Sequence, residues 1–455
     1  MATFRSRRIE ALFNSPIDQL SESHIQSLVT SGVEEAFDID YKEELYGSND
    51  SARRSLAGDV AAMANTAGGV IVLGVQEDQQ ARAVATPGVP LSDAETARMR
   101  QIVASLVAPH PTLDILNIPT AGNPSTGFYI LAIARSASAP HAVLINDGLR
   151  YPRHNGATTR YLSEPEVAEA YRMRLDSART RVERAEWIEN QAIEILERDV
   201  NPWLLVSLVP ALAGGFDLDQ EAFRTFENRM LGREAWSICP HGVSFRHVRT
   251  SRSRLIAHGG VNSPDAQWAS MEAHADGSGT YALRLPDLHR TAREKQTDQA
   301  QEIHTLVDDE QLVLAVLTGL MRLAENAQAR AGVSGDVVVR ARLLPSPLAR
   351  AIEIGHTRSF GIGESRSSVA VAGELSPAET AAPVEDLLAA TPTLIQTAAR
   401  LTNEIAQSFG IAELGQLTSM GAIRRRYWSV SGNTRANLEN WAAAGPLDVI
   451  DEVLG

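Results

Sequence analysis

Residues 37 to 45 read FDIDYKEEL, and this stretch decides how the N-terminal part of the chain folds. Apolar and charged side chains alternate along it. An alternation with a period of two predicts a β-strand that buries one face and exposes the other. The expected buried face holds Phe37, Ile39 and Tyr41, and the opposite face holds Asp38, Asp40 and Lys42.

The same stretch crowds carboxylates around one lysine. Like charges at this spacing repel one another, and burying any of them costs free energy. Lys42 is also unusual, because Lys295 is the only other lysine and every other basic residue is an arginine. Two interpretations follow. The carboxylates form a site whose repulsion a bound cation relieves, or they form the solvated face of an edge strand in which Lys42 only neutralises its neighbours.

The residues around this stretch alternate between helical and strand patterns. Helical spacing of Leu56, Val60 and Met63 predicts a helix that ends at the glycine turn of residues 65–69. The unbroken apolar run Val70 to Val75 predicts a buried central strand. The further expected elements are a helix capped at Ser92, strands near 113–118 and 128–134, a hairpin over 143–151 turning at Asp147 and Gly148, a polar loop over 153–160, and a helix from Ser163 that runs with a break to Glu197.

Four pieces of the N-terminal sequence occur in a recognisable order. They are Glu35 to Lys42, with an acidic residue, a four-residue gap and an acidic-aromatic-lysine triplet; Ala62 to Gly69, of the form A-x-A-N-T-x-G-G; Val70 to Asp78, an apolar run followed by G-V and acidic residues; and Tyr151 to Thr159, similar to Y-x-R-x-G-x-x-T with one inserted residue. Together they span about residues 30 to 175. This pattern resembles the Schlafen core, also called the AlbA-like or divergent AAA domain.

The resemblance implies an α+β fold in which a mixed AlbA-like sheet with flanking helices occupies residues 30–176, after an N-terminal extension of residues 1–29. We expect a helical linker over 177–200. Strand and helix patterns resume beyond Pro202, and they predict a second α/β or α+β domain over 201–455. That second domain carries no catalytic motif that the sequence reveals.

The resemblance also implies a chemistry, because some Schlafen-core proteins are metal-dependent ribonucleases that cut tRNA with a trio of carboxylates. In this chain the trio would be Glu35, Asp40 and either Glu77 or Asp78, of which Asp78 is the preferred metal ligand. Carboxylate oxygens suit a hard divalent cation, so Mg²⁺ or Mn²⁺ is the expected cofactor.

Two residues of this proposed site need comment. Asp40 stands where the family typically has Glu, and its shorter side chain draws the carboxylate back towards the strand. Lys42 is expected to contact the scissile phosphate through its ammonium group.

A binding surface for an RNA backbone requires cations. The candidates are Arg53, Arg54, Arg150, Arg153 and Arg160. The alternative is that these arginines are ordinary surface charge. The Asn65 to Gly69 turn is expected to be structural, with a backbone contact to phosphate as the alternative. A P-loop of the form G-x-x-x-x-G-K-[ST] does not occur, which disfavours an ATPase of that type.

Composition limits the remaining possibilities. A formal net charge of −14 argues against a protein that coats nucleic acid through bulk charge. Cys239 is the only cysteine, which excludes an intramolecular disulfide and fits a reducing compartment. The sequence shows no apolar stretch long enough for a membrane helix and no apolar core of signal-peptide type near its start. We therefore expect a cytoplasmic protein with no membrane partner.

The leading hypothesis is a bacterial Schlafen-like endoribonuclease, with tRNA as the substrate and anti-phage defence as the setting that the resemblance implies. A second hypothesis is a non-catalytic nucleic-acid-binding regulator, and a third is a nucleotide-binding or scaffold protein. One copy of the lobe offers few cations for folded RNA. We therefore expect a homodimer, in which a two-fold axis would double the basic loops.

Overall fold

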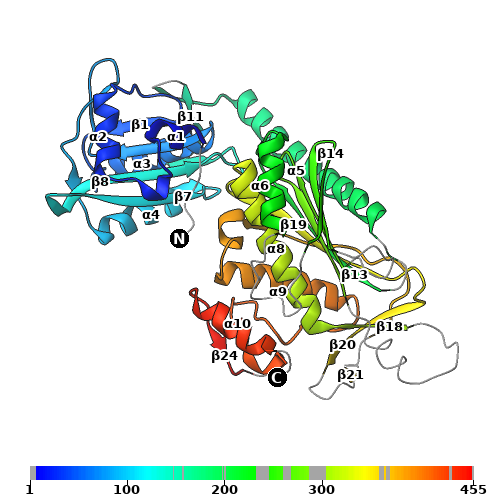
Figure 1. The fold of residues 1–455 in the computed structure, drawn as a ribbon. Helices are drawn as coiled ribbons and strands as arrows, with labels where there is room; N and C mark the ends of the chain where they lie inside the picture. The colour runs from blue at the N-terminus through cyan, green and yellow to red at the C-terminus, as the bar shows by residue number, and fades with distance from the viewer. Residues whose placement is uncertain are drawn as a thin grey trace, which may run out of the picture. The chain divides into compact units, whose positions relative to one another are not determined.

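The computed structural model describes residues 7–146, 148–155, 158–196, 198, 201–231, 245–259, 268–285, 304–357, 363–364, 369–429 and 433–452. The chain divides into two compact units, Met1–Thr180 and Arg181–Gly455. Both units contain helices and sheets, so the chain has the α+β architecture expected from its sequence (Figure 1). Across these described ranges, no helix combines the length and the apolar character that crossing a membrane requires.

The first unit is built from short helices around one main sheet. Its helices are α1 Arg7–Phe13, η1 Ile17–Gln19, α2 Glu22–Thr30, α3 Asp50–Ala64, α4 Asp93–Leu106 and the first part of α5 Glu164–Ile195. Its strands are β1 Ile39–Lys42, β2 Gly68–Leu73, β3 Gln76–Glu77, β4 Ala83–Ala85, β5 Val89–Pro90, β6 Val107–Ala108, β7 Leu113–Thr120, β8 Asn123–Ala134, β9 Ala142–Ile145, β10 Gly148–Arg150, β11 Pro152–Asn155 and β12 Thr158–Tyr161.

The main sheet of this unit is mixed and has helices on both faces. Its strand order is β1-β2-β8-β5, and β7 also pairs with β8. Strand β1 runs parallel to β2, whereas β2, β5 and β7 run antiparallel to β8. One apolar cluster joins the sheet to α3 and α4, and another joins it to α1 and α2. Strand β1 therefore lies at an edge of this sheet, between two layers of helices.

Most of the local structure that the sequence predicts is confirmed. Asn49 caps α3, because its side chain accepts a hydrogen bond from the backbone N–H of Ala52 at 2.9 Å. Ser92 caps α4 in the same way. The apolar run from Val70 forms β2, which lies between β1 and β8 as a central strand should. The predicted hairpin forms from β9 and β10, although Asp147 in its turn lies outside the described residues.

Three local expectations are wrong. Phe37 is 40% exposed and precedes β1, so the buried face of the strand begins at Ile39. The segment predicted as a polar loop contains the antiparallel strands β11 and β12, in which Arg153 pairs with Arg160. Helix α5 runs to Ile195 without the expected break. Gly156 and Ala157 between β11 and β12 lie outside the described residues, as do Cys239 and Lys295.

The second unit is dominated by one large sheet. Its strands are β13 Trp203–Pro210, β14 His247–Ser251, β15 Arg254–Gly259, β16 Ala269–His274, β17 Gly279–Arg284, β18 His304–Asp308, β19 Asp336–Leu344, β20 Ala351–Thr357, β21 Gly363–Glu364, β22 Ala378–Pro383, β23 Ile423–Arg424 and β24 Val449–Ile450. Its helices are the rest of α5, α6 Gln220–Leu231, α8 Asp309–Ala331, η3 Val384–Leu387, α9 Pro392–Gln407, η4 Arg425–Tyr427 and α10 Thr434–Ala443.

Seven antiparallel strands make this sheet, in the order β14-β15-β16-β17-β13-β19-β22. Helices α8 and α9 pack on one face and form the main core with it. The C-terminal part of α5 packs on other sheet side chains, where Ala185 and Ile188 contact Val209, and Ala192 joins a cluster around Trp203. This second unit is therefore also α+β, with helical cover on both faces of its sheet.

Candidate functional site

Strand β1 presents its charged residues on one face because the other face is committed to the core. Ile39 and Tyr41 are buried in the cluster that contains α1 and α2. The register places Asp40 beside Ile71 and Lys42 beside Leu73, and both of these partners belong to the cluster that contains α3. The charged side chains thus lie on the α3 side of the sheet.

Asp40 and Lys42 form a close ion pair on this face. The Lys42 ammonium lies 2.7 Å from Oδ1 and 2.6 Å from Oδ2 of Asp40. The Asp40 side chain is only 11% exposed, whereas that of Lys42 is 35% exposed. Burial lowers the pKa of Lys42, but the carboxylates of Asp40, Asp59 and Glu35 outweigh it and raise the pKa above its ordinary value. Lys42 therefore stays charged at physiological pH. The solvated-face interpretation does not describe Asp40, which is buried.

Glu35 approaches the same pair from the segment before β1. Its Oε1 accepts a hydrogen bond from the backbone N–H of Tyr41 at 2.7 Å. Burial, and then the negative charges of Asp40 and Glu77, raise the pKa of Glu35 from 4.5 to about 8, against the lowering effects of the Tyr41 N–H and Lys42. Asp40 and Glu77 are therefore close enough to oppose the ionisation of Glu35.

The Asp78 carboxylate is used in a turn between two strands. Its Oδ1 accepts hydrogen bonds from the backbone N–H groups of Gln80 at 2.8 Å and Arg82 at 3.0 Å, which fixes the turn between β3 and β4. Strand β3, which ends at Glu77, contacts β1. Of the two candidates for a third carboxylate, the structure thus brings Glu77 to the site and uses Asp78 in a turn.

Sequence reasoning missed three residues near the site. Asp59 on α3 accepts a hydrogen bond from the Tyr46 hydroxyl at 2.7 Å. Burial and the charge of Asp40 raise the pKa of Asp59, while Lys42 and His154 lower it. His154 on β11 is 8% exposed, and neither ring nitrogen has a hydrogen-bond partner among the described residues. One signal in the sequence could have identified Asp59: this aspartate lies next to Val60, which belongs to the apolar stripe of a predicted helix.

Carboxylate oxygens are suitable ligands for a hard divalent cation, but these carboxylates are not arranged around a common cation position. Among the residues that the structure describes, no group of three or more His, Cys, Asp or Glu side chains is arranged to hold a metal ion. Both oxygens of Asp40 face the Lys42 ammonium, which occupies the position that a cation would need. In this arrangement the site does not fit a bound divalent ion.

The glycine turn that precedes β2 is explained by the fold. The Asn65 amide donates to the carbonyl oxygens of His141 at 2.9 Å and Pro152 at 2.8 Å, and its oxygen accepts from the His141 N–H at 2.6 Å. A Cβ atom on Gly69 would lie 2.3 Å from the backbone oxygen of Asp38. Gly69 therefore allows β2 to approach the backbone that leads into β1, and the structural interpretation of the turn is the better supported one.

The five candidate arginines differ in their surroundings. Arg160 donates to both carboxylate oxygens of Glu166, at 3.0 and 2.6 Å. Arg53 lies 3.6 Å from Asp50. Arg54, Arg150 and Arg153 have no ion-pair or hydrogen-bond partner in the described part of the chain, and Arg150 and Arg153 are exposed on neighbouring segments.

Comparisons with known proteins identify this region. The family model described as Schlafen, AlbA_2 matches residues 35–162. No curated protein matches the chain. A crystal structure of a Corynebacterium diphtheriae protein aligns with 20% identity and a TM-score of 0.23, and the alignment covers 32% of this chain and 31% of that one.

A second solved structure is the N-terminal domain of a RecG-related protein, described as an ATP-dependent DNA helicase relative, from Nitrosomonas europaea. It aligns with 18% identity and a TM-score of 0.23, over 32% of this chain and 96% of that domain. The family match covers the carboxylates of the candidate site and the five candidate arginines, and it ends before α5. Residues 35–162 of this chain therefore match the Schlafen AlbA_2 family model, which covers less than half of the chain.

Proposed function

We propose that this chain binds nucleic acid through its Schlafen AlbA_2 domain and cleaves RNA at the site of Glu35, Asp40 and Lys42. A tRNA is the proposed substrate, and the reaction is hydrolysis or transfer at a phosphodiester bond. The family match supports nucleic-acid binding as the general role. The finer proposal depends on the side chains gathered at β1.

The observation that carries the proposal is the excess of carboxylates around one lysine. Asp40 is paired with Lys42, yet Glu35 and Asp59 also lie near enough to affect the same ammonium. A strand that served only to complete the sheet would gain nothing from this crowding, because each buried carboxyl loses hydration. Groups held in such a disfavoured arrangement are candidates for chemistry.

The basic residues have defined roles in this proposal. The Lys42 ammonium, which is 35% exposed, can contact a phosphate oxygen and stabilise negative charge that develops there. Arg150 and Arg153 are exposed and can contact the neighbouring phosphates of the backbone. Mg²⁺ or Mn²⁺ remains the proposed cofactor, although the present placement of the carboxylates does not fit it, so we assign it no step.

A second candidate function is non-catalytic binding of nucleic acid. It is favoured by the lack of a metal-holding group among the described residues, together with the exposed Arg150 and Arg153. In this case the Asp40–Lys42 pair would orient the edge strand rather than act on a phosphodiester bond.

Incubation of the purified protein with total tRNA separates the two candidates. Parallel reactions contain Mn²⁺, Mg²⁺ or EDTA, and the products are resolved on denaturing gels. Cleavage that requires the cation supports the metal-dependent ribonuclease. Cleavage that survives EDTA supports an RNase without the proposed cofactor, and retarded migration of intact tRNA on native gels supports the regulator. Glu77→Ala should reduce cleavage more than Asp78→Ala, since Asp78 belongs to a turn.

We further propose that the protein acts as a homodimer, and that its biological role is defence against bacteriophage. A dimer would present two copies of the exposed Arg150 and Arg153. Light scattering coupled to size exclusion tests the dimer: a 49.2 kDa monomer that still cuts tRNA would refute it. Plaque counts on cells that express the wild type or Asp40→Ala test the defence role, which requires fewer plaques with the wild type only.

A further inference from the structure

The second unit contains a polar cavity that the proposed function does not use. It lies over β19, whose residues alternate between the two faces of the large sheet. Val337, Val339 and Ala341 point into the core that α8 and α9 cover. Arg340 and Arg342 point to the opposite face, together with Leu344, which packs in the cluster with Ala192 of α5. Two arginines thus lie side by side on the face that α5 partly covers.

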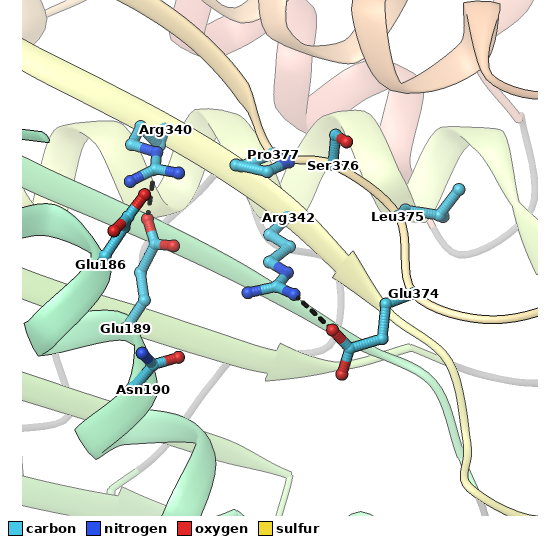
Figure 2. A pocket seen from close by; sticks show the side chains of 9 residues that line it. All are labelled: Glu186, Glu189, Asn190, Arg340, Arg342, Glu374, Leu375, Ser376 and Pro377. Atoms are coloured by element: carbon cyan, nitrogen blue, oxygen red, sulfur yellow. Dashed lines mark hydrogen bonds and ion pairs between the residues drawn. The ribbon is translucent and has the colours of Figure 1, made fainter.

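The cavity above these arginines has walls from two other segments. Figure 2 shows Glu186, Glu189 and Asn190 of α5 on one side, and the segment Glu374 to Pro377 on the other. Its volume is about 430 Å³, which is within the range of small-molecule sites. All of its lining residues belong to the second unit. The cavity is too small for a folded macromolecule and large enough for a metabolite.

Arg340 is buried with part of its hydrogen-bonding capacity unused. Its residue exposure is 6%, and its Nε lies 3.5 Å from a carboxylate oxygen of Glu189 and 3.5 Å from one of Glu379. The same Glu189 oxygen accepts a shorter hydrogen bond of 2.6 Å from the Ser207 hydroxyl. Within the described residues, the Nε and Nη1 of Arg340 have no hydrogen-bond partner. Buried guanidinium N–H groups that have no hydrogen-bond acceptor cost free energy even beside carboxylates, so this arginine is suited to a further acceptor.

Arg342 lies two residues along the same strand and is more accessible. Its Nη2 donates to Glu374 at 3.0 Å, but the Glu374 side chain is 77% exposed. An ion pair with such an exposed partner contributes little and exchanges readily. The Nε of Arg342 is buried and also has no hydrogen-bond partner within the described residues. An anion that entered the cavity could therefore take the place of Glu374.

We propose that this cavity binds a small oxyanion, a phosphate ester or a carboxylate, in contact with the guanidinium groups of Arg340 and Arg342. Planar guanidinium groups bind such oxyanions through paired hydrogen bonds, and both arginines have donors to offer. Asn190 and the exposed Glu186 lie at the α5 wall, where they can accept hydrogen bonds from amino or hydroxyl groups elsewhere on the ligand. The second unit would then be a ligand-binding module.

Isothermal titration calorimetry on the full chain tests this proposal with three probes: inorganic phosphate, adenosine monophosphate and succinate. Sodium chloride at matched ionic strength is the blank. We expect saturable binding of at least one probe, and the strongest one tells whether the site prefers a phosphate ester, free phosphate or a carboxylate. Arg342→Gln should weaken that binding by about tenfold or more, because it removes one guanidinium fork.

Two further variants locate the site. Arg340→Lys keeps the positive charge but loses the planar fork, so binding should weaken by a similar factor. Arg252→Gln, at an exposed turn of the same unit, should bind like the wild type. Far-UV circular dichroism confirms that each variant is folded, and Arg342→Gln alone decides the matter if Arg340→Lys unfolds. The proposal is overturned if no probe binds saturably up to 10 mM, or if Arg342→Gln binds as tightly as Arg252→Gln.

Discussion

Two neighbouring pieces of the region that matches the Schlafen AlbA_2 family differ in how well the fold explains them. In the turn from Asn65 to Gly69, the Asn65 side chain uses its donors and its acceptor on nearby backbone, and Gly69 fits where no Cβ can. In the site at β1, Glu35 and Asp40 are crowded together although the charge of Asp40 opposes the ionisation of Glu35. The fold accounts for the first set of residues and leaves the second unexplained.

This difference separates two kinds of motif residue. A structural motif residue is one whose removal leaves a hole, a clash or an unpaired backbone group. A candidate functional residue is one whose presence costs the fold something. The contrast predicts loss of activity with retained stability at β1, and loss of stability at the turn.

The largest effect is expected from removing the carboxylates. Asp40→Ala and Glu35→Ala should each lower tRNA cleavage by at least about 100-fold, because each removes a carboxyl group of the proposed cleavage site. Single-turnover rates measure this loss. Their melting temperatures should stay near that of the wild type. Glu34→Ala, which removes the exposed partner of Arg82, is the matched control and should cleave normally. If both site variants cleave at the wild-type rate, Glu35 and Asp40 are not needed for cleavage, and the contrast between a functional site and a structural turn is wrong.

The next effect concerns the turn. Gly69→Ala should lower the free energy of unfolding by about 2–4 kcal/mol, since its Cβ would meet backbone that cannot move away easily. Gly58→Ala is the control: a Cβ there has no neighbour within 4 Å, and alanine in a helix should add up to about 1 kcal/mol. Urea unfolding compares the two. Equal stability of both variants would mean that the turn is not held by this close approach.

A smaller effect is expected when Lys42 is replaced by another cation. Lys42→Arg should reduce tRNA cleavage by about tenfold, because the broader guanidinium cannot hold the same point between Asp40 and a phosphate. The reverse exchange, Arg100→Lys on α4, lies outside the candidate RNA-contacting arginines and should leave cleavage unchanged. Cleavage at the wild-type rate in Lys42→Arg would mean that any cation suffices at this position. Lys42 would then have a structural role, like the residues of the turn.

The smallest effect is a dependence of stability on pH. The pKa of Glu35 is about 8 in the folded protein and 4.5 ordinarily, so the folded state binds this proton more tightly. The contribution of this tighter proton binding to the free energy of unfolding is complete below pH 4.5 and is lost as pH rises towards about 8. Glu35→Gln is neutral and keeps an oxygen for the Tyr41 N–H, so it should abolish this loss. Urea unfolding at several pH values should show that the free energy of unfolding of Glu35→Gln increases relative to that of the wild type as pH rises. A difference that does not change with pH would contradict the assignment.

The sequence by itself determined the local part of this molecule. Alternation around Ile39 and Tyr41 predicts β1, and the apolar run from Val70 predicts β2, because side-chain periodicity follows backbone geometry. The order of four short motifs identifies the domain, which the family match over residues 35–162 confirms. The glycine turn could also be predicted, since paired glycines permit backbone geometry that other residues resist.

Only the tertiary structure decided which charged groups meet. Asp59 and His154 reach the site from α3 and β11, far from residue 40 in sequence, so no spacing could reveal them. Glu77 rather than Asp78 comes to the site because the Asp78 carboxylate is used by a turn. The arginines of β19 face a cavity because α5 covers only part of that sheet face. Charge interactions depend on distance through space and on lost hydration, and packing sets both.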